Sequence, residues 1–303
     1  MVAVKSSSKL SRRERTNLSR GLLFISPWLL GLIIFTIYPL IYSIIFSFTR
    51  YSGFRRPVWL GMQNYTRLFS DSLFWLSLGN TLYYVLWAVP IGIVVALLLA
   101  LAMNRDVREV NVYRAILYLP SILPTFALAF IFIVLINPQY GIVNIFFSLF
   151  GVPTQNFLSD PLGAKNVIIV LAQLGAGNAA LIFLAGLRGI PATLYDAARI
   201  DGAGVWRRFY SITLPLLSPI ILFNLITALS GGLQIFQQAY IMTNGGPNNG
   251  TLFYMLYLYR NAFAYAQLGY ACALSLVLFV IGLALAGILF SVAQRFVNYE
   301  MVS

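Results

Sequence analysis

The sequence has 303 residues, of which 60% are hydrophobic and only 9% carry a charge. Soluble chains carry about 25% charged residues, so this composition excludes a soluble globular domain and predicts a protein whose solvent is mostly lipid. The net charge of +12 does not indicate a nucleic-acid partner, because the basic residues lie in short segments that flank apolar runs. The chain has no histidine and one cysteine, Cys272, in an apolar run, so neither an internal disulfide nor a metal site is expected.

The N-terminal residues form a basic segment that contains KSSSKLSRRER and precedes a long apolar run. A cleaved signal peptide has a short apolar core and a small-residue cleavage site. The run that begins at Gly21 is longer and ends in IIFSFTR. We therefore expect a retained first membrane span, with residues 1–20 as a basic tail in the cytoplasm.

Six apolar runs are long enough to cross a membrane as helices, which takes roughly 20 residues each. They are Leu22–Phe48, Leu76–Met103, Ala115–Ile136, Val167–Leu187, Leu216–Met242 and Leu268–Ala293. The sequence thus predicts an all-α polytopic membrane protein. Residues 21–295 form a single transmembrane domain, and residues 296–303 form a second cytoplasmic tail.

The distribution of Lys and Arg predicts that both termini face the cytoplasm, because cytoplasmic segments carry an excess of these residues. In that orientation the inner set is Lys5, Lys9, Arg12, Arg13, Arg15, Arg20, Arg105, Arg108, Arg114, Arg188, Arg199, Arg207, Arg208 and Arg295. The outer set is smaller: Arg50, Arg55, Arg56, Arg67, Lys165 and Arg260. Four of these outer residues lie in the first outer loop, against the general trend.

Two of the predicted outer segments have a distinctive composition. Residues 137–166 contain GIVNIFFSLFGVP, an amphipathic stretch that suits a short helix on the membrane surface. Residues 243–251 read TNGGPNNGT, a cluster of turn-forming residues.

No charged side chain lies in the middle of a predicted span. Charges at that depth usually mark an ion path or a proton relay, so their absence argues against a proton-coupled carrier. Sodium coupling through backbone carbonyls remains open. The chain also lacks the G-x-x-x-x-G-K-[ST] loop, so a pump built on it must receive its energy from another subunit.

The spans contain neutral polar residues instead. The third span carries LPSILPTF, the fourth AQLGAGNAA and the fifth TALSGGLQIFQQAY. In the fifth span Thr227, Ser230 or Gly231, Gln234 and Gln238 recur at helical spacing, so we expect them to share one face. Amides and hydroxyls beside aromatic rings suit a neutral polyhydroxylated ligand such as a sugar. The alternative is that these residues join helices to one another, and that the prolines of the third span act only as kinks.

A polar segment, residues 190–215, separates the fourth and fifth spans. Pro191 can open a helix, and Thr193 and Asp196 have the spacing of a capping box. The helix is expected to run to about Asp201, and Gly202 can take the left-handed conformation that ends it. A second short helix is predicted to begin near Gly204. This helix, bend and helix would serve either as a docking handle for another protein or as a plain amphipathic connector.

The same segment resembles the cytoplasmic EAA loop of binding-protein-dependent ABC importer permeases, whose pattern is E-A-A-x-x-x-G followed by a hydrophobic stretch that ends in L-P. The chain reads DAARIDGA from Asp196 and continues to FYSITLP, with Asp196 in place of the usual Glu. Further stretches resemble the carbohydrate-uptake branch, the maltose and glycerol-phosphate permease relatives, over nearly the whole chain. They are FISPWLLGLIIFTIYPL, NTLYYVL, VYRAILYLPSILP, FLAGLRGIP and TNGGPNNGT.

The resemblance implies a sugar-transporting permease subunit, not an enzyme, in a bacterial-type cytoplasmic membrane. Its partners would be a second homologous permease, two ATP-binding subunits and an extracytoplasmic solute-binding protein. The chain itself would bind no cofactor, because ATP and Mg²⁺ belong to the ATPase subunits. The resemblance assigns coupling to the ATPases to Asp196, Ala197, Ala198, Asp201 and Gly202. It assigns the substrate path to Ser121, Thr125, Asn178 and Gln234, to which the shared face of the fifth span adds Gln238.

Two other classes of function compete with this interpretation. An ion-coupled secondary sugar carrier would need an inverted repeat and broken, ion-coordinating spans, and the sequence shows no internal repeat. A polytopic membrane enzyme would need a catalytic constellation. The chain offers neither histidine nor an intramembrane carboxylate for one.

Overall fold

The computed structural model describes residues 12–105 and 109–293, and it is almost entirely helical. Five helical segments are long and apolar enough to span a membrane, and a sixth is a bent pair. They are Arg20–Ser47, Ser72–Met103, the pair Asn111–Ile122 and Thr125–Leu135, Pro161–Gly189, Ser218–Met242 and Leu268–Ala293. The predicted all-α polytopic class is confirmed, and each predicted span overlaps one of these segments.

The helices follow one another along the chain with few other elements. The α-helices are α1 (Arg12–Leu32), α2 (Tyr38–Ser47), α3 (Gln63–Ser70), α4 (Ser72–Met103), α5 (Val110–Ile122), α6 (Thr125–Leu135), α7 (Ile142–Ser148), α8 (Pro161–Gln173), α9 (Gly177–Gly189), α10 (Ala192–Ile200), α11 (Val205–Arg208), α12 (Leu214–Leu216), α13 (Ser218–Leu233), α14 (Gln237–Met242), α15 (Tyr254–Tyr259) and α16 (Leu268–Ala293). The π-helical turns η1 (Ile33–Ile37), η3 (Phe209–Thr213) and η4 (Arg260–Ala264) and the 3₁₀ turn η2 (Leu174–Ala176) join some of them. Strands β1 (Thr49–Arg50) and β2 (Val58–Trp59) pair in an antiparallel hairpin.

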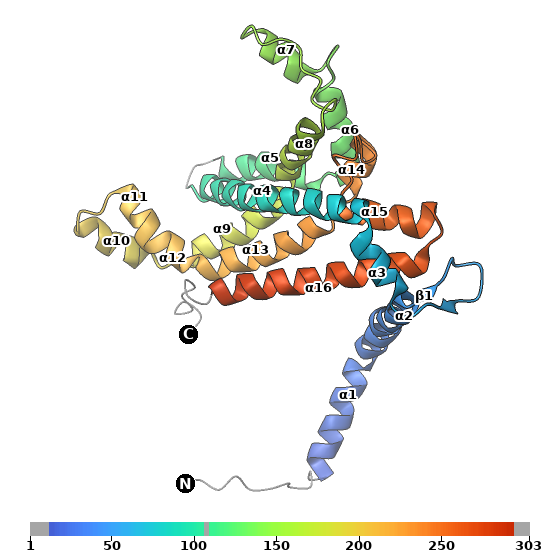
Figure 1. The fold of residues 1–303 in the computed structure, drawn as a ribbon. Coiled ribbons are helices and arrows are strands. Elements are labelled where there is room, and N and C mark those ends of the chain that lie inside the picture. Colours follow the sequence, from blue (N-terminus) through green and yellow to red (C-terminus); the bar gives the residue numbers. More distant parts are fainter. Residues whose placement is uncertain (1–11, 106–108, 294–303) are drawn as a thin grey trace.

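The first span begins further upstream than the sequence indicated. α1 starts at Arg12, so the described part of the predicted N-terminal tail is helical and continuous with the span. Figure 1 shows α1 leaving the rest of the molecule, and none of the most hydrophobic window of this span is buried. α2 packs along α16. The predicted C-terminal tail, residues 296–303, lies outside the described residues.

α4 forms the centre of the bundle and packs against α8, α9 and α13. Toward the C-terminal end of α4, Ala96 and Ala100 are fully buried in one apolar cluster with Phe183 of α9. Toward its N-terminal end, Phe74 lies in a second cluster that also contains Tyr254 of α15. Small residues at the first contact let the two helix backbones approach closely, which is how helices pack in membranes.

The third span is broken. α5 and α6 meet at 95° across Leu123 and Pro124, both of which have extended backbone with ψ of 136° and 138°. A residue before proline is disfavoured in helical conformation, and Pro124 has no N–H to donate. The expectation of a kink is confirmed for Pro124, whereas Pro120 lies within α5; the third span is thus a bent pair and not one continuous helix over Ala115–Ile136.

The fifth span is also interrupted. α13 ends at Leu233, Phe236 has φ −141° and ψ −60°, and α14 begins at Gln237. The interruption follows the Gly231–Gly232 pair, which lowers helix propensity. Thr227, Gly231, Gln234 and Gln238 still line neighbouring cavities, so the expected shared face persists although the helix is interrupted after Leu233.

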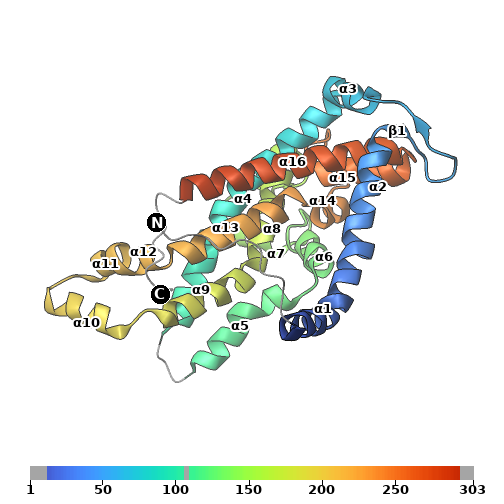
Figure 2. The ribbon, with the colours of Figure 1, turned by 90° about the horizontal axis from the view of Figure 1, so that it is seen from below.

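Two loops match their predicted character. α7 is a short helix within residues 137–166, and residues 243–251 form turns. Asn244, Asn248 and Asn249 adopt positive φ there, as turn-forming residues do. Figure 2 shows the hairpin and α3 at one end of the elongated helical body, and α10 and α11 at the opposite end.

Candidate functional site

The segment from α10 to α11 forms a sharply bent elbow, here called the elbow (residues 190–215). Gly202 has φ +74°, and its N–H donates to the carbonyl of Arg199 at 3.0 Å. The N–H of Ala203 donates to the carbonyl of Ala198 at 2.8 Å. This pair of bonds is the Schellman motif, in which a left-handed glycine satisfies the last carbonyls of a helix. The predicted end of the first helix near Asp201 and Gly202 is confirmed.

The start of α10 differs from the prediction. Pro191 occupies the N-cap position, no side chain caps the helix, and Thr193 already lies within it. The carboxylate of Asp196 instead accepts from Arg199 at 3.1 Å on the exposed surface. The capping box is therefore wrong, because Pro191 fixes the helix start two residues before the position that the motif required.

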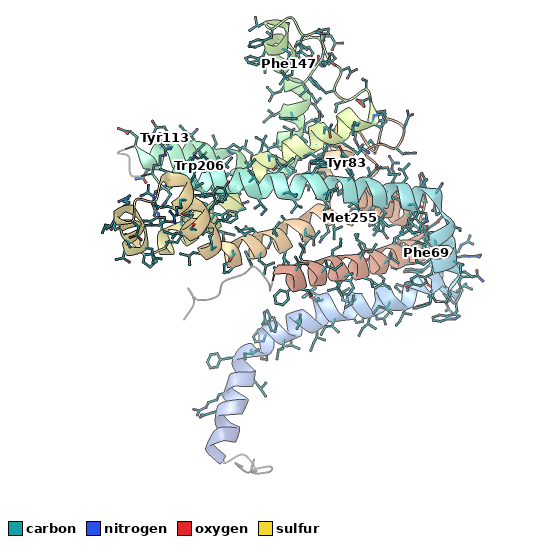
Figure 3. The ribbon with its side chains drawn as sticks, turned by 60° about the vertical axis from the view of Figure 1, so that its left-hand side comes forward. Phe69, Tyr83, Tyr113, Phe147, Trp206 and Met255 are labelled. Carbon is teal, nitrogen blue, oxygen red and sulfur yellow. The ribbon has the colours of Figure 1, made fainter. Side chains whose placement is uncertain are left out.

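Most residues of the elbow between Pro191 and Gly204 are exposed. No residue of α10 is buried: Asp196, Ala197, Asp201 and Gly202 are exposed, and Ala198 is half-buried. Beyond the bend, Trp206 of α11 lies near Tyr113 of α5, and both line a cavity of about 1090 Å³ (Figure 3). A hydrogen bond of 2.8 Å between the hydroxyls of Tyr195 and Thr213 ties α10 to η3. The elbow is thus an internally bonded projection with an exposed surface.

A first cavity, of about 360 Å³, lies between α4, the α8–α9 turn, α13 and α14. Its polar lining residues are Tyr84, Gln173, Asn178, Asn224, Thr227 and Gln238. A second cavity, also of about 360 Å³, is lined by Thr125 of α6 together with Gln234, Gln237 and Gln238. The two cavities share Tyr84, Gly231 and Gln238, so they are neighbours along one polar strip. No charged residue lines either cavity.

The predicted path residues divide into two groups. Asn178 lines the first cavity, Thr125 and Gln234 line the second, and Gln238 lines both. Ser121 lines neither: its hydroxyl donates to the carbonyl of Leu174 at 3.1 Å and accepts the N–H of Gly177 at 2.9 Å. Ser121 therefore positions the end of α5 against the α8–α9 turn.

The contact between Ser121 and Gly177 leaves no room for a side chain on Gly177. A Cβ at Gly177 would lie 2.3 Å from the Ser121 hydroxyl oxygen and 3.0 Å from its Cβ. One residue further, the Asn178 side chain accepts a hydrogen bond of 3.0 Å from the Tyr118 hydroxyl. Two neighbouring residues, Gly177 and Asn178, therefore hydrogen-bond to α5 of the broken third span and hold it against the α8–α9 turn.

Sequence reasoning missed two polar groups of the first cavity. Asn224 is buried and donates to the carbonyl of Ile220 at 3.0 Å, and Tyr84 is also buried. Asn224 lies three residues before Thr227, on the same helical face, and that spacing could have identified it. Tyr84 carries no such signal, because it comes from a different helix.

A polar cluster around the half-buried Asp71, at the hairpin end, was also not predicted. The carboxylate of Asp71 accepts hydrogen bonds from Tyr257 and, at 3.0 Å, from Tyr270, and it caps α4 through Leu73 N–H at 2.9 Å. Burial alone would raise the pKa of Asp71, but the hydrogen bonds from Tyr257, the backbone and Tyr270 together hold this pKa below its ordinary value. The cluster joins α4, α15 and α16.

The family model for the binding-protein-dependent transport system inner membrane component matches residues 88–301. The chain is 38% identical to the probable ABC transporter permease protein YesP of Bacillus subtilis, over 96% of each chain. It is 33% identical to the arabinooligosaccharides transport system permease protein AraP of the same species, over 86% of this chain and 83% of the relative. It is also 33% identical to the lactose transport system permease protein LacF of Rhizobium radiobacter, over 97% and 99%.

Among solved structures, a chain of a bacterial ABC transporter that imports the acidic polysaccharide alginate has the same fold. The TM-score is 0.81 at 24% identity, and the match covers 95% of this chain and 100% of the other. This likeness supports the arrangement of the helices, and the family match extends over most of the chain. The protein therefore belongs to the family of inner membrane components of binding-protein-dependent transport systems and is a permease subunit of an ABC importer.

Proposed function

We propose that this chain forms one half of the path by which an ABC importer moves a sugar or oligosaccharide into the cell. The observation that carries the proposal is the uncharged polar strip of the two cavities that meet at Gln238. Its amides and hydroxyls can both donate and accept hydrogen bonds, as sugar hydroxyls require. The names of the relatives, which include lactose and arabinooligosaccharide permeases, favour the same substrate class.

The aromatic residues beside the strip support a sugar further. The rings of Phe236 and Tyr240 stack with centroids 5.3 Å apart at the break between α13 and α14, and Phe236 lines the second cavity. Sugars present apolar faces that pack on aromatic rings, while their hydroxyl edges bond to amides. Thr125, Asn178, Gln234 and Gln238 are the residues proposed to contact the substrate.

We propose that the elbow couples this path to two separate ATP-binding subunits. Asp196, Ala197, Ala198, Asp201 and Gly202 would form the docking surface, and ATP with its Mg²⁺ would be bound by the partners. The exposure of α10 and the closed Schellman turn support this role, because a lever must be accessible and must not unwind when it is pushed. In this orientation the elbow and both termini face the cytoplasm, and the hairpin faces the outside of the cytoplasmic membrane.

A second homologous permease would complete the path, and an extracytoplasmic solute-binding protein would deliver the substrate. The first span favours a neighbouring membrane subunit, since only its α2 half packs along α16 while α1 leaves the rest of the described structure with its apolar side chains largely exposed. Alternating access would follow when the ATPases close and move the elbow, which is connected through η3 and α12 to α13. α13 contributes Asn224, Thr227 and Gly231 to the first cavity.

Reconstitution tests the proposal. The chain, co-expressed with its partner permease, ATPases and binding protein, should accumulate sugar in proteoliposomes only when ATP is enclosed with the ATPases. Asp196→Lys should weaken co-purification of the ATPases, while Asp196→Glu, which restores the residue usual in the family, should retain it. Accumulation by the isolated chain without ATP would refute the proposal. Uptake that collapses with an uncoupler at constant ATP would favour an ion-coupled carrier instead.

The path residues are tested by substrate competition. Gln234→Ala should change the order in which a panel of sugars competes for uptake, because the side chain lines the second cavity. Gln139→Ala is the matched control, since Gln139 is exposed and lines neither cavity. An unchanged order in the Gln234 variant would remove this residue from the path.

A further inference from the structure

Another cavity, of about 370 Å³, lies at the hairpin end and shares no residue with the two cavities of the polar strip. It is formed by the hairpin root, α3 and the start of α16, and we call it the hairpin pocket. Its charged lining residues are Arg50 and Arg67, and Gln63, Asn64 and Gln267 are among its polar ones. No carboxylate lines it, so the pocket offers two guanidinium groups and neutral hydrogen-bonding side chains.

The walls of the hairpin pocket are held in place by the fold. The buried Asn64 amide donates to the carbonyls of Ser47 and Thr49 at 2.8 and 2.9 Å, which fixes α3 against the hairpin root. The Arg67 guanidinium lies 4.3 Å above the ring of Tyr270 and donates to the Gln267 side chain at 2.8 Å. The pocket is therefore pre-organised, which reduces the entropy lost when a ligand binds.

Neither Arg50 nor Arg67 forms a salt bridge with a described residue. Asp71 is one helical turn from Arg67, but its carboxylate accepts hydrogen bonds from Tyr257, Tyr270 and the backbone and makes no ion pair with Arg67. Among the described residues the only salt bridge lies in the elbow, at the other end of the molecule. Arginines in an outer loop also oppose the usual placement of positive charge in membrane proteins. These two facts together indicate that the arginines serve an anionic ligand.

The surroundings of the pocket favour a protein as the source of that anion. Along the hairpin and its exit, Phe54, Trp59 and Met62 are 92%, 66% and 60% exposed. Arg55 and Arg56 lie beside Phe54 at the tip, and both are exposed. Aromatic residues, Met and Arg are the residue types enriched at protein interfaces, whereas a free small anion would need no apolar rim.

We propose that the hairpin pocket receives an acidic side chain of the extracytoplasmic solute-binding protein. The inference rests on the proposed function, which places the hairpin outside the cell. Arg50 and Arg67 would pair with the incoming carboxylate, and Arg55 and Arg56 would steer the approach of an acidic surface. Phe54 and Trp59 would supply the apolar contact of the docked state. Docking here would anchor the binding protein beside the path, not within it.

The test uses the assembled transporter in nanodiscs and the purified solute-binding protein that stimulates its ATP hydrolysis. Association is measured at several NaCl concentrations. Paired replacement of Arg50→Glu and Arg67→Glu should weaken binding by about tenfold or more, mainly through faster dissociation, and should reduce the salt dependence. Replacing both arginines by Lys should preserve the salt dependence. Arg20→Glu, at the opposite end of the first span, is the matched single-charge control for Arg50→Glu and should change neither quantity.

Unchanged affinity with unchanged salt dependence in the paired Glu variant would overturn the inference. A loss of affinity in phosphatidylglycerol nanodiscs that disappears in phosphatidylcholine nanodiscs would also overturn it, because the arginines would then act through lipid headgroups. If the paired variant fails to assemble, Arg55→Glu with Arg56→Glu on the exposed tip provides the same test through the association rate. Failure of the wild-type chain to co-purify with ATPases would instead refute the proposed function.

Discussion

Substitution of Gly202 tests whether the bend of the elbow transmits work. No atom lies within 4 Å of a Cβ placed on this glycine, so Gly202→Ala adds only the cost of a left-handed conformation, about 1 kcal/mol. Gly202→Pro is more severe. It forces φ from +74° to about −65° and removes the N–H that donates to Arg199, at a cost of about 3 kcal/mol or more. Because no residue of α10 is buried, this cost falls on the elbow and not on the transmembrane core.

The expected result is a graded loss of coupling. A cost of about 1 kcal/mol lowers the ratio of intact to broken turn by a factor of about five, so Gly202→Ala should retain part of the uptake. Gly202→Pro should leave ATP hydrolysis running while uptake falls by about a hundredfold, since about 3 kcal/mol corresponds to two powers of ten. Both rates are measured on the same proteoliposomes, so that sugar imported per ATP hydrolysed is the reported quantity.

Gly204→Ala is the matched control for this series. Gly204 lies in the same segment and is also free of neighbours within 4 Å, but its φ of −64° is accessible to any residue. It should therefore import as much sugar per ATP as the wild-type protein. If Gly202→Pro also matched the wild-type ratio, the bend would not act as a lever, and the role proposed for the elbow would have to be abandoned.

Three further predictions concern other parts of the chain. Gly177→Ala should destabilise the protein by about 1–3 kcal/mol, because its Cβ would lie 2.3 Å from the Ser121 hydroxyl oxygen. Adding Ser121→Gly to this variant should restore part of the lost melting temperature. If Gly177→Ala and the wild-type protein melt at the same temperature, the close approach is contradicted. Gly231→Trp should reduce uptake by about tenfold or more at unchanged melting temperature. No atom lies within 4 Å of a Cβ placed on Gly231, and the indole would fill the polar strip. Normal uptake in this variant would exclude the strip as the substrate path. Asp71 has a lowered pKa in the folded protein, so its stabilisation is complete above its ordinary pKa and is lost as the pH falls through the folded value. Asp71→Asn should therefore flatten the fall of melting temperature below about pH 4, and an unchanged acid profile would show that the hydrogen bonds from Tyr257 and Tyr270 contribute nothing.

Much of the architecture follows from local sequence. Apolar length predicted five of the spans and the position of the bent pair, because a helix that crosses the bilayer must be both long and uncharged. The end of α10 was predictable from Gly202, since a helix that stops in a left-handed residue almost requires glycine. The break at Pro124 was predictable as a kink, but the angle of 95° was not, because it depends on what α6 packs against. α6 contacts α14, which lies more than a hundred residues further along the chain.

The errors have physical causes as well. The predicted capping box is absent because Pro191, and not Thr193, occupies the N-cap position of α10. The interruption of the fifth span after Leu233 was not predicted, because helical spacing alone does not show that a pair of glycines lowers helix propensity. The clamp of Asp71 joins residues that are nearly two hundred positions apart, and one sequence contains no sign of such a pairing.

The break between α5 and α6 also determines where the protein must be hydrated. The backbone groups freed by the turn at Leu123 and Pro124 lose their helical partners at membrane depth, and hydrocarbon cannot replace those partners. Either another protein surface or a column of water must therefore reach this point. Next to the break, Thr125 lines the second cavity, so a water-filled path through the bilayer would begin at the point where the helical hydrogen bonds are interrupted.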